Sequence, residues 1–332
     1  MHIPDGFLAT PVWATLDLAA IPVMGYCVRR TQARFDESRA PLLGVMGAFV
    51  FAAQMINFPV GVGTSGHLVG GALLALTLGP WAASVVMTAI LVVQALVFQD
   101  GGITALGANI LNMAVAGVWL GYLPVKLAGG PKRAAVFLGG WLSMVGAALL
   151  ATVQLSLSQV APNGPLFASM LGIHALTGLA EGAITVAAFG AIARLSPKFV
   201  FGFTTPAPGP NHAIAVPPVA APAASLEAGD GFEPARRGVV KRLVWAVGGT
   251  TLLLALVGAI VASTAPAGLE RVAERLGFAS RGAATVTGSP FADYQARFVH
   301  SPWLAPAAAG LLGVMLLYGF GVLFRRALQR RK

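Results

Sequence analysis

Long apolar runs separated by short clusters of basic residues constrain this chain more than any other feature. The sequence is 56% hydrophobic and only 10% charged, and its mean hydropathy is +0.76. These values lie far outside the range of soluble globular domains. A run of about 20 apolar residues can cross a bilayer as a helix, because a helix satisfies its main-chain polar groups internally. The sequence therefore predicts an all-α integral membrane protein.

The apolar runs predict nine transmembrane helices, seven in a first bundle and two in a C-terminal module. The run from Leu68 to Phe98 has 31 residues, which is roughly 46 Å of helix against a bilayer core of about 30 Å. Gly79-Pro80 would break it into a short third span and a fourth span. The expected spans begin and end near residues 8–28, 41–60, 68–78, 81–98, 104–124, 134–157, 166–192, 243–262 and 303–324.

Basic residues set the expected orientation, because cytoplasmic loops of membrane proteins carry an excess of Lys and Arg. With nine spans, 18 of the 22 basic residues fall on the cytoplasmic side, and the exceptions are Arg271, Arg275, Arg281 and Arg297. We therefore expect an extracytoplasmic N-terminus and a cytoplasmic C-terminus, in the bacterial inner membrane with lipids as neighbours. The net charge of +10 forms no basic stripe with interleaved aromatic residues, which argues against nucleic acid as a partner.

Composition divides the chain into two modules. Residues 206–234 are rich in Pro and Ala and poor in bulky apolar side chains, as is typical of a flexible linker. We expect a seven-span module over residues 1–200, a cytoplasmic linker over 201–235, and a two-span module over 236–332. The second module would carry an extracytoplasmic loop over residues 263–301.

The first seven residues, Met-His-Ile-Pro-Asp-Gly-Phe, predict part of a metal site. The α-amino nitrogen of Met1, the main-chain nitrogen of His2 and Nδ1 of His2 can bind one cation through fused five- and six-membered rings. These nitrogens occupy three corners of a square, which favours Ni²⁺ or Cu²⁺, and less often Co²⁺, over Zn²⁺, Ca²⁺ or Mg²⁺. The Pro-Asp-Gly turn lets the terminus fold back over the residues that follow. The alternative is a disordered terminal histidine.

Position selects His67 for the fourth corner of the square. It lies in an uncharged, Gly-rich outer turn on the same side as Met1, and a neighbouring glycine leaves room for the folded-back terminus. The other histidines are less suitably placed, with His174 inside span seven, His212 in the linker and His300 in the second module.

Four segments recur in the order of a known family. They are Met1 to Phe7, Gly-Thr-Ser-Gly-His-Leu at Gly63 to Leu68, Gly-Pro-Trp at Gly79 to Trp81, and His-Ala-Leu-Thr-Gly-Leu-Ala-Glu-Gly at His174 to Gly182. Over residues 1 to about 200 they resemble the substrate-binding M component of nickel and cobalt energy-coupling-factor transporters. The resemblance implies that Met1, His2 and His67 hold the ion in a square plane. It also implies two partners, a transmembrane coupling (T) component and a pair of ATP-binding-cassette ATPases.

The second module resembles, more loosely, the small two-span N component that accompanies M. The family's Pro-Asp-Gly-Leu-Glu appears as Pro266 to Glu270 with Ala267 in place of the aspartate, and Ala292 to Tyr294 echoes a later segment. Fusion with M is more often a nickel than a cobalt arrangement in this family, which favours Ni²⁺ as the transported substrate.

Several polar residues inside or beside the spans are expected to support the site. Gln54, Asn57 and Ser65 are expected close to the ligand histidines, and Asn109 and Asn112 in span five are a less favoured pair. Three ionisable groups inside the expected spans, Asp17, His174 and Glu181, are expected to hydrogen-bond between spans without touching the ion.

The sequence favours a transporter subunit over an enzyme. It contains neither a Gly-x-x-x-x-Gly-Lys-Ser/Thr phosphate loop nor a His-Glu-x-x-His motif, so we expect ATP hydrolysis in separate partners. The alternatives are a cobalt importer for cobalamin biosynthesis with the same architecture, a passive metal channel and a metal-sensing membrane receptor. Ala-, Leu- and Gly-rich spans argue against the channel, and the lack of a recognisable effector domain argues against the receptor.

Overall fold

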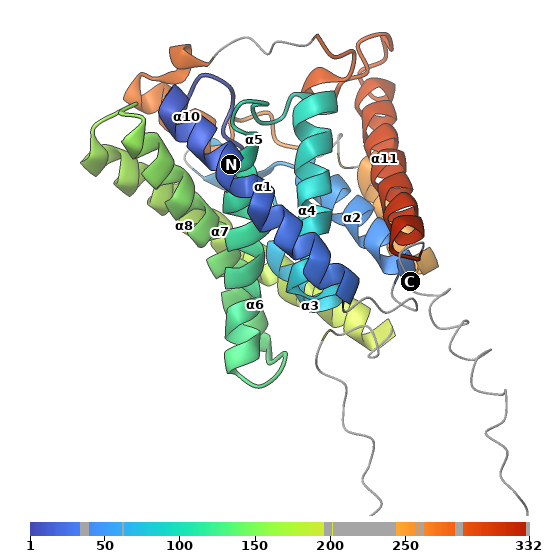
Figure 1. Ribbon diagram of the computed structural model, residues 1–332. Coiled ribbons are helices and arrows are strands. Elements are labelled where there is room, and N and C mark those ends of the chain that lie inside the picture. The colour runs from blue at the N-terminus through green and yellow to red at the C-terminus, as the bar shows by residue number, and fades with distance from the viewer. Residues whose placement is uncertain are drawn as a thin grey trace, which may run out of the picture.

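Helices make up nearly all the regular structure of the computed structural model (Figure 1). The structure describes residues 1–33, 40–61, 63–195, 201, 244–256, 258, 262–282 and 288–329. The helices of the first module are α1 (Thr10–Ala33), α2 (Ala40–Gln54), α3 (Gly71–Leu78), α4 (Pro80–Val93), α5 (Leu106–Asn109), α6 (Val118–Leu127), α7 (Arg133–Leu157) and α8 (Asn163–Leu195). Two π-helical segments, Gln94–Phe98 and Ile110–Gly117, continue α4 and join α5 to α6.

Six helices among the described residues are long and apolar enough to cross a membrane. They are Thr10–Ala33, Pro80–Phe98, Leu106–Leu127, Arg133–Leu157, Asn163–Leu195 and Leu304–Ala327, with shorter apolar helices at Pro41–Gln54 and Val244–Leu256. The expectation of an apolar helical bundle is thereby confirmed, and the chain is a multi-pass membrane protein.

The third expected span is short, as the Gly79-Pro80 break predicted. The helix α3 has 8 residues, so it is about 12 Å long and covers less than half of a bilayer core. It ends at the expected break, where Gly79 takes a φ of 83° and Pro80 begins α4. Glycine adopts this backbone readily, and proline is favoured in the first turn of a helix.

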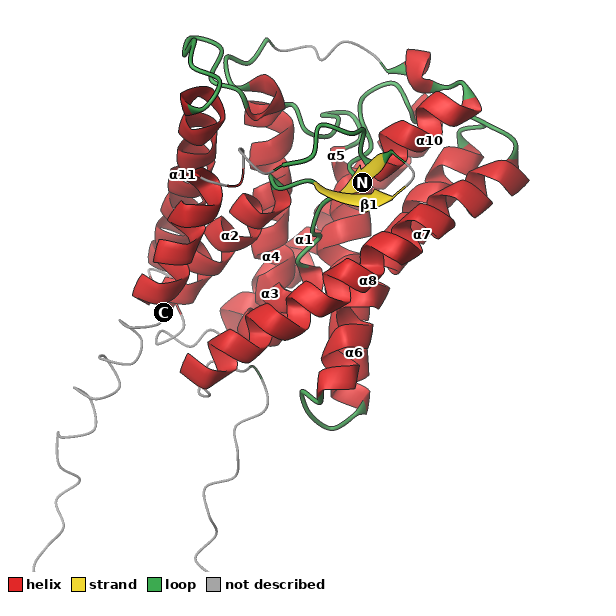
Figure 2. Ribbon diagram, turned by 180° about the vertical axis from the view of Figure 1, so that it is seen from behind, coloured by secondary structure: helices red, strands yellow, loops and turns green. Residues whose placement is uncertain are grey.

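A β-hairpin replaces the last part of the second expected span. The helix α2 ends at Gln54, and β1 (Phe58–Gly61) pairs antiparallel with β2 (Thr64–Gly66). Pro59 cannot continue a helical hydrogen-bond ladder, which accounts for the early end. Seen from behind, β1 lies beside the N-terminus (Figure 2). The hairpin therefore brings the segment that leads into His67 towards Met1.

Small residues let the helices of the first module approach closely. A Cβ on Gly182 of α8 would lie 2.7 Å from the main-chain oxygen of Phe137 on α7, and one on Gly140 would lie 2.8 Å from Cα of Gly182. Apolar lipid supplies no hydrophobic drive between helices, so close packing of small residues is the usual source of contact energy.

The C-terminal module contains the helix Val244–Leu256, α10 (Gly268–Leu276), two 3₁₀ turns (Ala279–Arg281 and Ala292–Tyr294) and α11 (Leu304–Gln329). Figure 1 shows α11 running beside α2. A Cβ on Gly44 of α2 would lie 3.1 Å from the main-chain oxygen of Tyr318, so glycine permits this contact. Apart from Phe201, the expected linker 201–235, with His212, lies outside the described residues.

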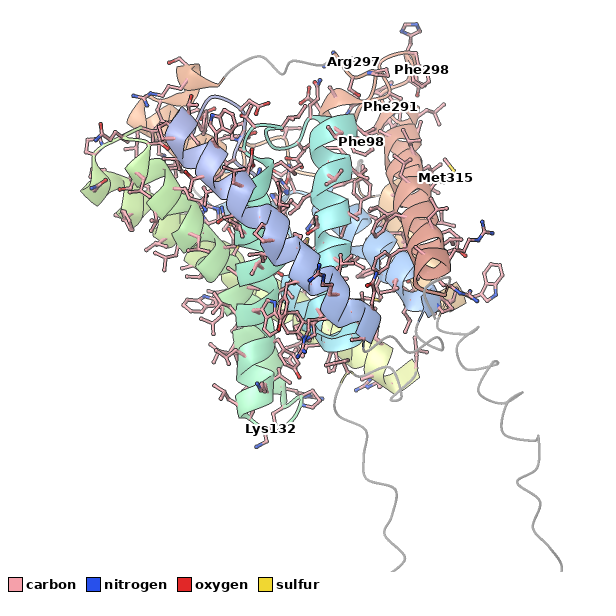
Figure 3. The ribbon with its side chains drawn as sticks, viewed as in Figure 1. Phe98, Lys132, Phe291, Arg297, Phe298 and Met315 are labelled. Carbon is pink, nitrogen blue, oxygen red and sulfur yellow. The ribbon has the colours of Figure 1, made fainter. Side chains whose placement is uncertain are left out.

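The two ends of the bundle carry different features. Lys132 lies at one end, and Phe98 and Phe291 lie at the other (Figure 3). The N-terminus lies towards the end that carries Phe98 (Figure 1). The N-terminus and Lys132, expected on opposite sides of the membrane, are therefore at opposite ends of the molecule.

Candidate metal centre

The N-terminal segment is bound into the protein at the start of α1. Met1, His2 and Ile3 are only 6%, 7% and 0% exposed. The side chain of Asn109 accepts a hydrogen bond from Ile3 N (2.9 Å) and donates one to Ile3 O (3.0 Å), so it pairs with the main chain as a neighbouring strand would. Gly102 N also donates to Ile3 O (2.8 Å). These contacts fix the main chain directly after His2.

The expected Pro-Asp-Gly turn is present and is held by its own aspartate. Asp5 accepts hydrogen bonds from Thr104 N (2.8 Å), Thr104 Oγ1 (2.6 Å) and Ile103 N (3.2 Å), and Gly6 has a φ of 85°. The turn reverses the chain between the docked terminus and α1. The terminal amine is consequently directed into the molecule, where it meets the segment after β2.

The Met1 amine and the His67 imidazole are in direct contact. Met1 N lies 2.9 Å from His67 Nε2, and His67 Nδ1 lies 3.0 Å from the main-chain oxygen of Leu68. A proton on Nδ1, shared with this carbonyl, leaves the lone pair of Nε2 facing the amine. Histidines that bind metals are usually oriented in this way by a hydrogen bond from their other ring nitrogen.

The His2 side chain lies against His67 and Asp100. The two imidazoles are stacked, with centroids 5.1 Å apart and planes inclined by 4°. His2 Nδ1 lies 2.9 Å from Asp100 Oδ1, in a geometry that does not meet that of a hydrogen bond. Neither ring nitrogen of His2 has a hydrogen-bond partner among the described residues, although the side chain is only 3% exposed. Buried nitrogens without partners are rare in proteins, and here they lie where a ligand could use them.

Burial favours the unprotonated forms of the Met1 amine and the His67 imidazole. It lowers the pKa of the Met1 amine, against the opposing attraction of Asp100. Burial, followed by the nearby amine and His2, lowers the pKa of His67 well below its ordinary value. Burial alone would raise the pKa of Asp100, but His2 beside it, together with a hydrogen bond from Tyr294, holds that pKa below its ordinary value. An amine and an imidazole whose protonation is disfavoured, next to a carboxylate, suit a cation.

Glu181 holds the main chain that follows His67. Its two carboxylate oxygens accept hydrogen bonds from Val69 N (2.7 Å) and Gly70 N (2.8 Å), and the side chain is fully buried on α8. Gly70 has a φ of 74°, which glycine adopts without strain. This carboxylate on α8 therefore fixes the main chain directly after His67 and so helps to set the position of the imidazole.

His174 shares a small cavity with two of the candidate ligands. Residues that line the cavity are Met1, Gly66, His67, Met144, His174, Thr177 and Gly268. The side chain of His174 is 3% exposed, and its Nδ1 lies 2.7 Å from the main-chain oxygen of Met170. His174 thus lies near the candidate centre, although its Nδ1 is already engaged within α8.

The other residues expected near the site contact different parts of the protein. Gln54 Nε2 donates to Val69 O (2.6 Å), and its Oε1 accepts from Gln94, so it contacts the His67 segment and neither histidine. Ser65 Oγ donates to Ala265 O (2.7 Å) in the C-terminal module. The main-chain oxygen of Asn57 accepts from Ser263 N (2.7 Å).

The less favoured polar residues of span five also have defined places. Asn109 pairs with Ile3, so it is closer to the terminus than the pair Gln54 and Asn57 that sequence reasoning preferred. Asn112 exchanges two hydrogen bonds with Gln154 (2.8 and 2.7 Å), away from the histidines. Asp17 accepts from Gly107 N (2.6 Å) and holds α1 to α5.

Sequence reasoning missed Asp100 and the role of Tyr294. Asp100 follows an apolar span in the segment Gln-Asp-Gly-Gly, and a carboxylate at the outer end of a span was a signal that could have been used. Tyr294 Oη donates to Asp100 Oδ2 (2.6 Å) across 194 residues of sequence. No local pattern predicts a contact at that separation.

Side chains alone do not form a metal cluster in the part of the chain that the structure describes. No group of three or more His, Cys, Asp and Glu side chains there is arranged to hold an ion. A transition metal at this centre would therefore need the terminal amine or main-chain nitrogens in addition to the two imidazoles.

Two family models match this chain. The cobalt uptake substrate-specific transmembrane region matches residues 2–199, and the PDGLE domain matches residues 241–330. The first match covers more than half of the chain and contains the whole candidate centre except Met1.

The chain is also similar to individual metal transport proteins and to a solved structure. The chain is 31% identical to the fused nickel transport protein NikMN of Rhodobacter capsulatus, with 100% of this chain and 99% of that protein covered. It is 34% identical to the cobalt transport protein CbiM of Nostoc sp. over 60% of this chain and 81% of the relative. The crystal structure of a truncated transition metal transporter superposes with a TM-score of 0.53 at 34% identity, over 58% of this chain and 99% of that chain.

Proposed function

Since this chain belongs to the cobalt uptake substrate-specific transmembrane family and carries a fused PDGLE domain, we propose that it is the substrate-binding subunit of an energy-coupling-factor importer for Ni²⁺. Its relatives are named as nickel and cobalt transport proteins, so it is a metal-transport component of a membrane and not an enzyme. Beyond metal transport, we propose which ion is carried, which atoms bind it and which subunits supply the energy.

The proposed ligands are the amine of Met1, the main-chain nitrogen and Nδ1 of His2, and Nε2 of His67. In the fused chelate rings the amide lies between the amine and Nδ1, so the fourth ligand must lie opposite the amide and next to the amine. With metal–nitrogen bonds of about 2.0–2.1 Å, neighbouring corners of a square are roughly 2.9 Å apart. The observation that carries the proposal is the 2.9 Å separation of Met1 N and His67 Nε2.

The nitrogen set favours nickel over cobalt. Four nitrogens in a plane, one of them a deprotonated amide, exert a strong in-plane field that stabilises low-spin Ni²⁺ more than Co²⁺, and the Irving–Williams order has the same direction. Cu²⁺ would bind more tightly still, so selectivity in a cell must depend on its low availability. The second candidate is a cobalt importer for cobalamin biosynthesis, which the family description and the cobalt-transport relative favour.

Energy would come from partner subunits. We infer a transmembrane T component and two ATP-binding-cassette ATPases, because the sequence contains no phosphate loop of its own. The ion would be captured at the extracytoplasmic end of the seven-span module (residues 1–200) and released on the cytoplasmic side of the bacterial inner membrane. The module over residues 236–332 would be joined through a cytoplasmic linker, and the nine-span topology would carry all 18 expected cytoplasmic basic residues on the inside.

Competition dialysis with equal Ni²⁺ and Co²⁺ tests the ion and the geometry. Purified full-length protein with a free amino terminus should retain mainly Ni²⁺, in a yellow, diamagnetic complex. A preference for Co²⁺ would support the cobalt importer, and a paramagnetic six-coordinate Ni²⁺ complex would refute the square plane.

Uptake into vesicles tests the energy source. The proposal expects ATP-dependent Ni²⁺ uptake only when the T component and the ATPases are present with the chain. Uptake by the chain alone would indicate a channel, and binding without uptake in the complete assembly would favour a receptor.

A further inference from the structure

One residue of the C-terminal module reaches the candidate metal centre. Tyr294 Oη donates a 2.6 Å hydrogen bond to Asp100 Oδ2, and the other oxygen of this carboxylate lies 2.9 Å from His2 Nδ1. A single carboxylate therefore separates the tyrosine of the second module from a proposed ligand of the first.

Several contacts hold Tyr294 in this position. Its ring is stacked on Phe98, with centroids 4.9 Å apart and planes inclined by 14°, and its hydroxyl accepts a hydrogen bond from Gln94 Nε2 (3.1 Å). Asp293 and Tyr294 have φ values of 57° and 56°, in the left-handed region that few non-glycine residues adopt. Two such residues in succession persist only where the surrounding contacts impose the backbone. The contacts of Tyr294 with Phe98, Gln94 and Asp100 are the ones that hold this backbone.

The same tyrosine is connected to the segment that carries His67. Gln94 Nε2 also donates to Gln54 Oε1 (2.8 Å), and Gln54 Nε2 donates to Val69 O (2.6 Å), two residues after His67. A continuous path of polar contacts thus runs from His2 through Asp100, Tyr294 and two glutamines to the main chain beside the second histidine. Each hydrogen bond along this path restricts the orientation of the side chains that it joins.

We propose that Tyr294 is a positioning residue of the metal centre, which fixes the Asp100 carboxylate as a counter-charge beside the His2 nitrogen that would bind a divalent cation. The inference rests on the proposed ligand role of His2. Asp100 Oδ1 faces Nδ1, the proposed ligand atom itself, so the carboxylate would act on the charge of the ion and not through the other nitrogen of the ring. Two deprotonated groups, the His2 amide and the Asp100 carboxylate, would balance the two positive charges of the ion, and the tyrosine hydroxyl holds the carboxylate where it can do so.

The rival explanation is that Tyr294 only joins the two modules. In that case its hydroxyl would contribute to stability, but metal binding would not depend on Asp100 through it. Tyr294→Phe separates the two explanations, because it keeps the ring on Phe98 and removes only the oxygen. Tyr318→Phe is the matched control, since it makes the same change at a half-exposed tyrosine of α11 in the same module.

The test uses full-length protein with a free amino terminus and Ni²⁺ alone as the probe. Dissociation constant, visible absorption spectrum and melting temperature would be measured for wild type, Tyr294→Phe, Asp100→Asn, Tyr318→Phe and the Tyr294→Phe/Asp100→Asn double variant. We expect Tyr294→Phe to raise the Kd about tenfold, at the lower end of what loss of an outer partner costs, and to shift the nickel absorption band. Tyr318→Phe should match wild type.

The double variant shows whether the tyrosine acts through the carboxylate. Once Asp100 is neutral, Tyr294→Phe should add little further loss, because interacting residues give non-additive effects. Wild-type Kd and spectrum in Tyr294→Phe would overturn the inference, as would an undiminished additional loss in the double variant or a lowered melting temperature with unchanged binding. If wild-type protein binds no Ni²⁺, the proposed function fails first and this inference with it.

Discussion

The two modules contribute to the candidate centre in different ways. The first module supplies both histidines and the amine, and its own side chains hold them, with Asn109 on Ile3 and Glu181 on Val69 and Gly70. Two contacts of the C-terminal module lie beside the candidate ligands, in addition to its apolar packing against the N-terminal segment through Phe278 and Phe7. One is Tyr294, and the other is the segment Ala265–Gly268.

The second contact lies over the cavity shared by Met1 and His67. Ser65 N donates to Pro266 O (2.9 Å), Ser65 Oγ donates to Ala265 O (2.7 Å), and Gly268 lines the cavity. The acceptors in these bonds are main-chain oxygens, which every residue carries. The bonds therefore depend on the backbone path of this segment and not on its side chains. In this comparison the proposed ligands all belong to the first module, whereas the second module contacts their surroundings through Tyr294 and Gly268. Four experiments can break or sharpen this division.

An extension before Met1 should have the largest effect, because it converts the proposed amine ligand into an amide. A short N-terminal tag, or retention of the formyl group, should abolish Ni²⁺ binding, and the buried terminus leaves no room for added residues. Metal content per purified protein is the measurement. The same tag placed after Lys332 is the control and should leave metal content unchanged. Equal occupancy in both tagged proteins would end the assignment of the amine.

Replacing the two buried histidines of the first module should come next. His67→Ala removes a proposed ligand and should weaken Ni²⁺ binding by more than the roughly 10- to 100-fold that loss of an outer partner costs. His174→Ala should lower the melting temperature more than the metal affinity, because it loses the bond to Met170 O and leaves a gap in the cavity wall. Isothermal titration and thermal melts would be compared. Equal loss of affinity in both variants would assign His174 to the metal.

Hydropathy and local turn chemistry predicted much of the fold. The apolar runs indicated the spanning helices, Gly79-Pro80 marked the end of α3, and the Pro-Asp-Gly turn indicated a folded-back terminus. The β-hairpin after Gln54 was missed, because the hydropathy of an apolar window does not distinguish a buried strand from the end of a spanning helix.

Local sequence patterns likewise predicted some residues of the candidate site and not others. His2 and His67 could be paired from sequence because both sit beside turns on one expected side of the membrane. Asp100 and Tyr294 could not, because their contact spans 194 residues and depends on how α11 and the loop before it pack on the first module. Tertiary packing decides such contacts, and no local propensity encodes them.

Removing the C-terminal module should have a moderate effect on binding and a complete effect on transport. A chain ending at Ala235 keeps Met1, His2 and His67 but loses Tyr294 and the cover of the cavity, so its Kd for Ni²⁺ should rise about tenfold. Uptake with the partner subunits should disappear. Supplying residues 236–332 as a separate chain should restore both, which controls for misfolding. Full transport by the truncated chain would show that the second module is dispensable.

The smallest expected effect is a difference in the number of protons released per Ni²⁺ between the protein and its free N-terminal peptide. Binding always displaces the proton of the His2 amide, and it displaces others only from ligands that are protonated beforehand. Burial lowers the pKa of the Met1 amine from its ordinary 8.0 and that of His67 well below 6.5, so both groups should hold fewer protons at pH 8 than they would in water. The protein should therefore release fewer protons per Ni²⁺ at pH 8 than an exposed site with the same ligands, and its affinity should fall as pH decreases.

The matched comparison is the free peptide Met-His-Ile-Pro-Asp-Gly-Phe, whose amine is exposed to water. An amine with an ordinary pKa of about 8 is half protonated at pH 8, so the peptide should release more protons per ion than the protein. Calorimetric titration in buffers of different ionisation enthalpy counts these protons. Equal counts would mean that burial in the first module does not prepare the amine, and the ligand geometry alone would then have to account for capture.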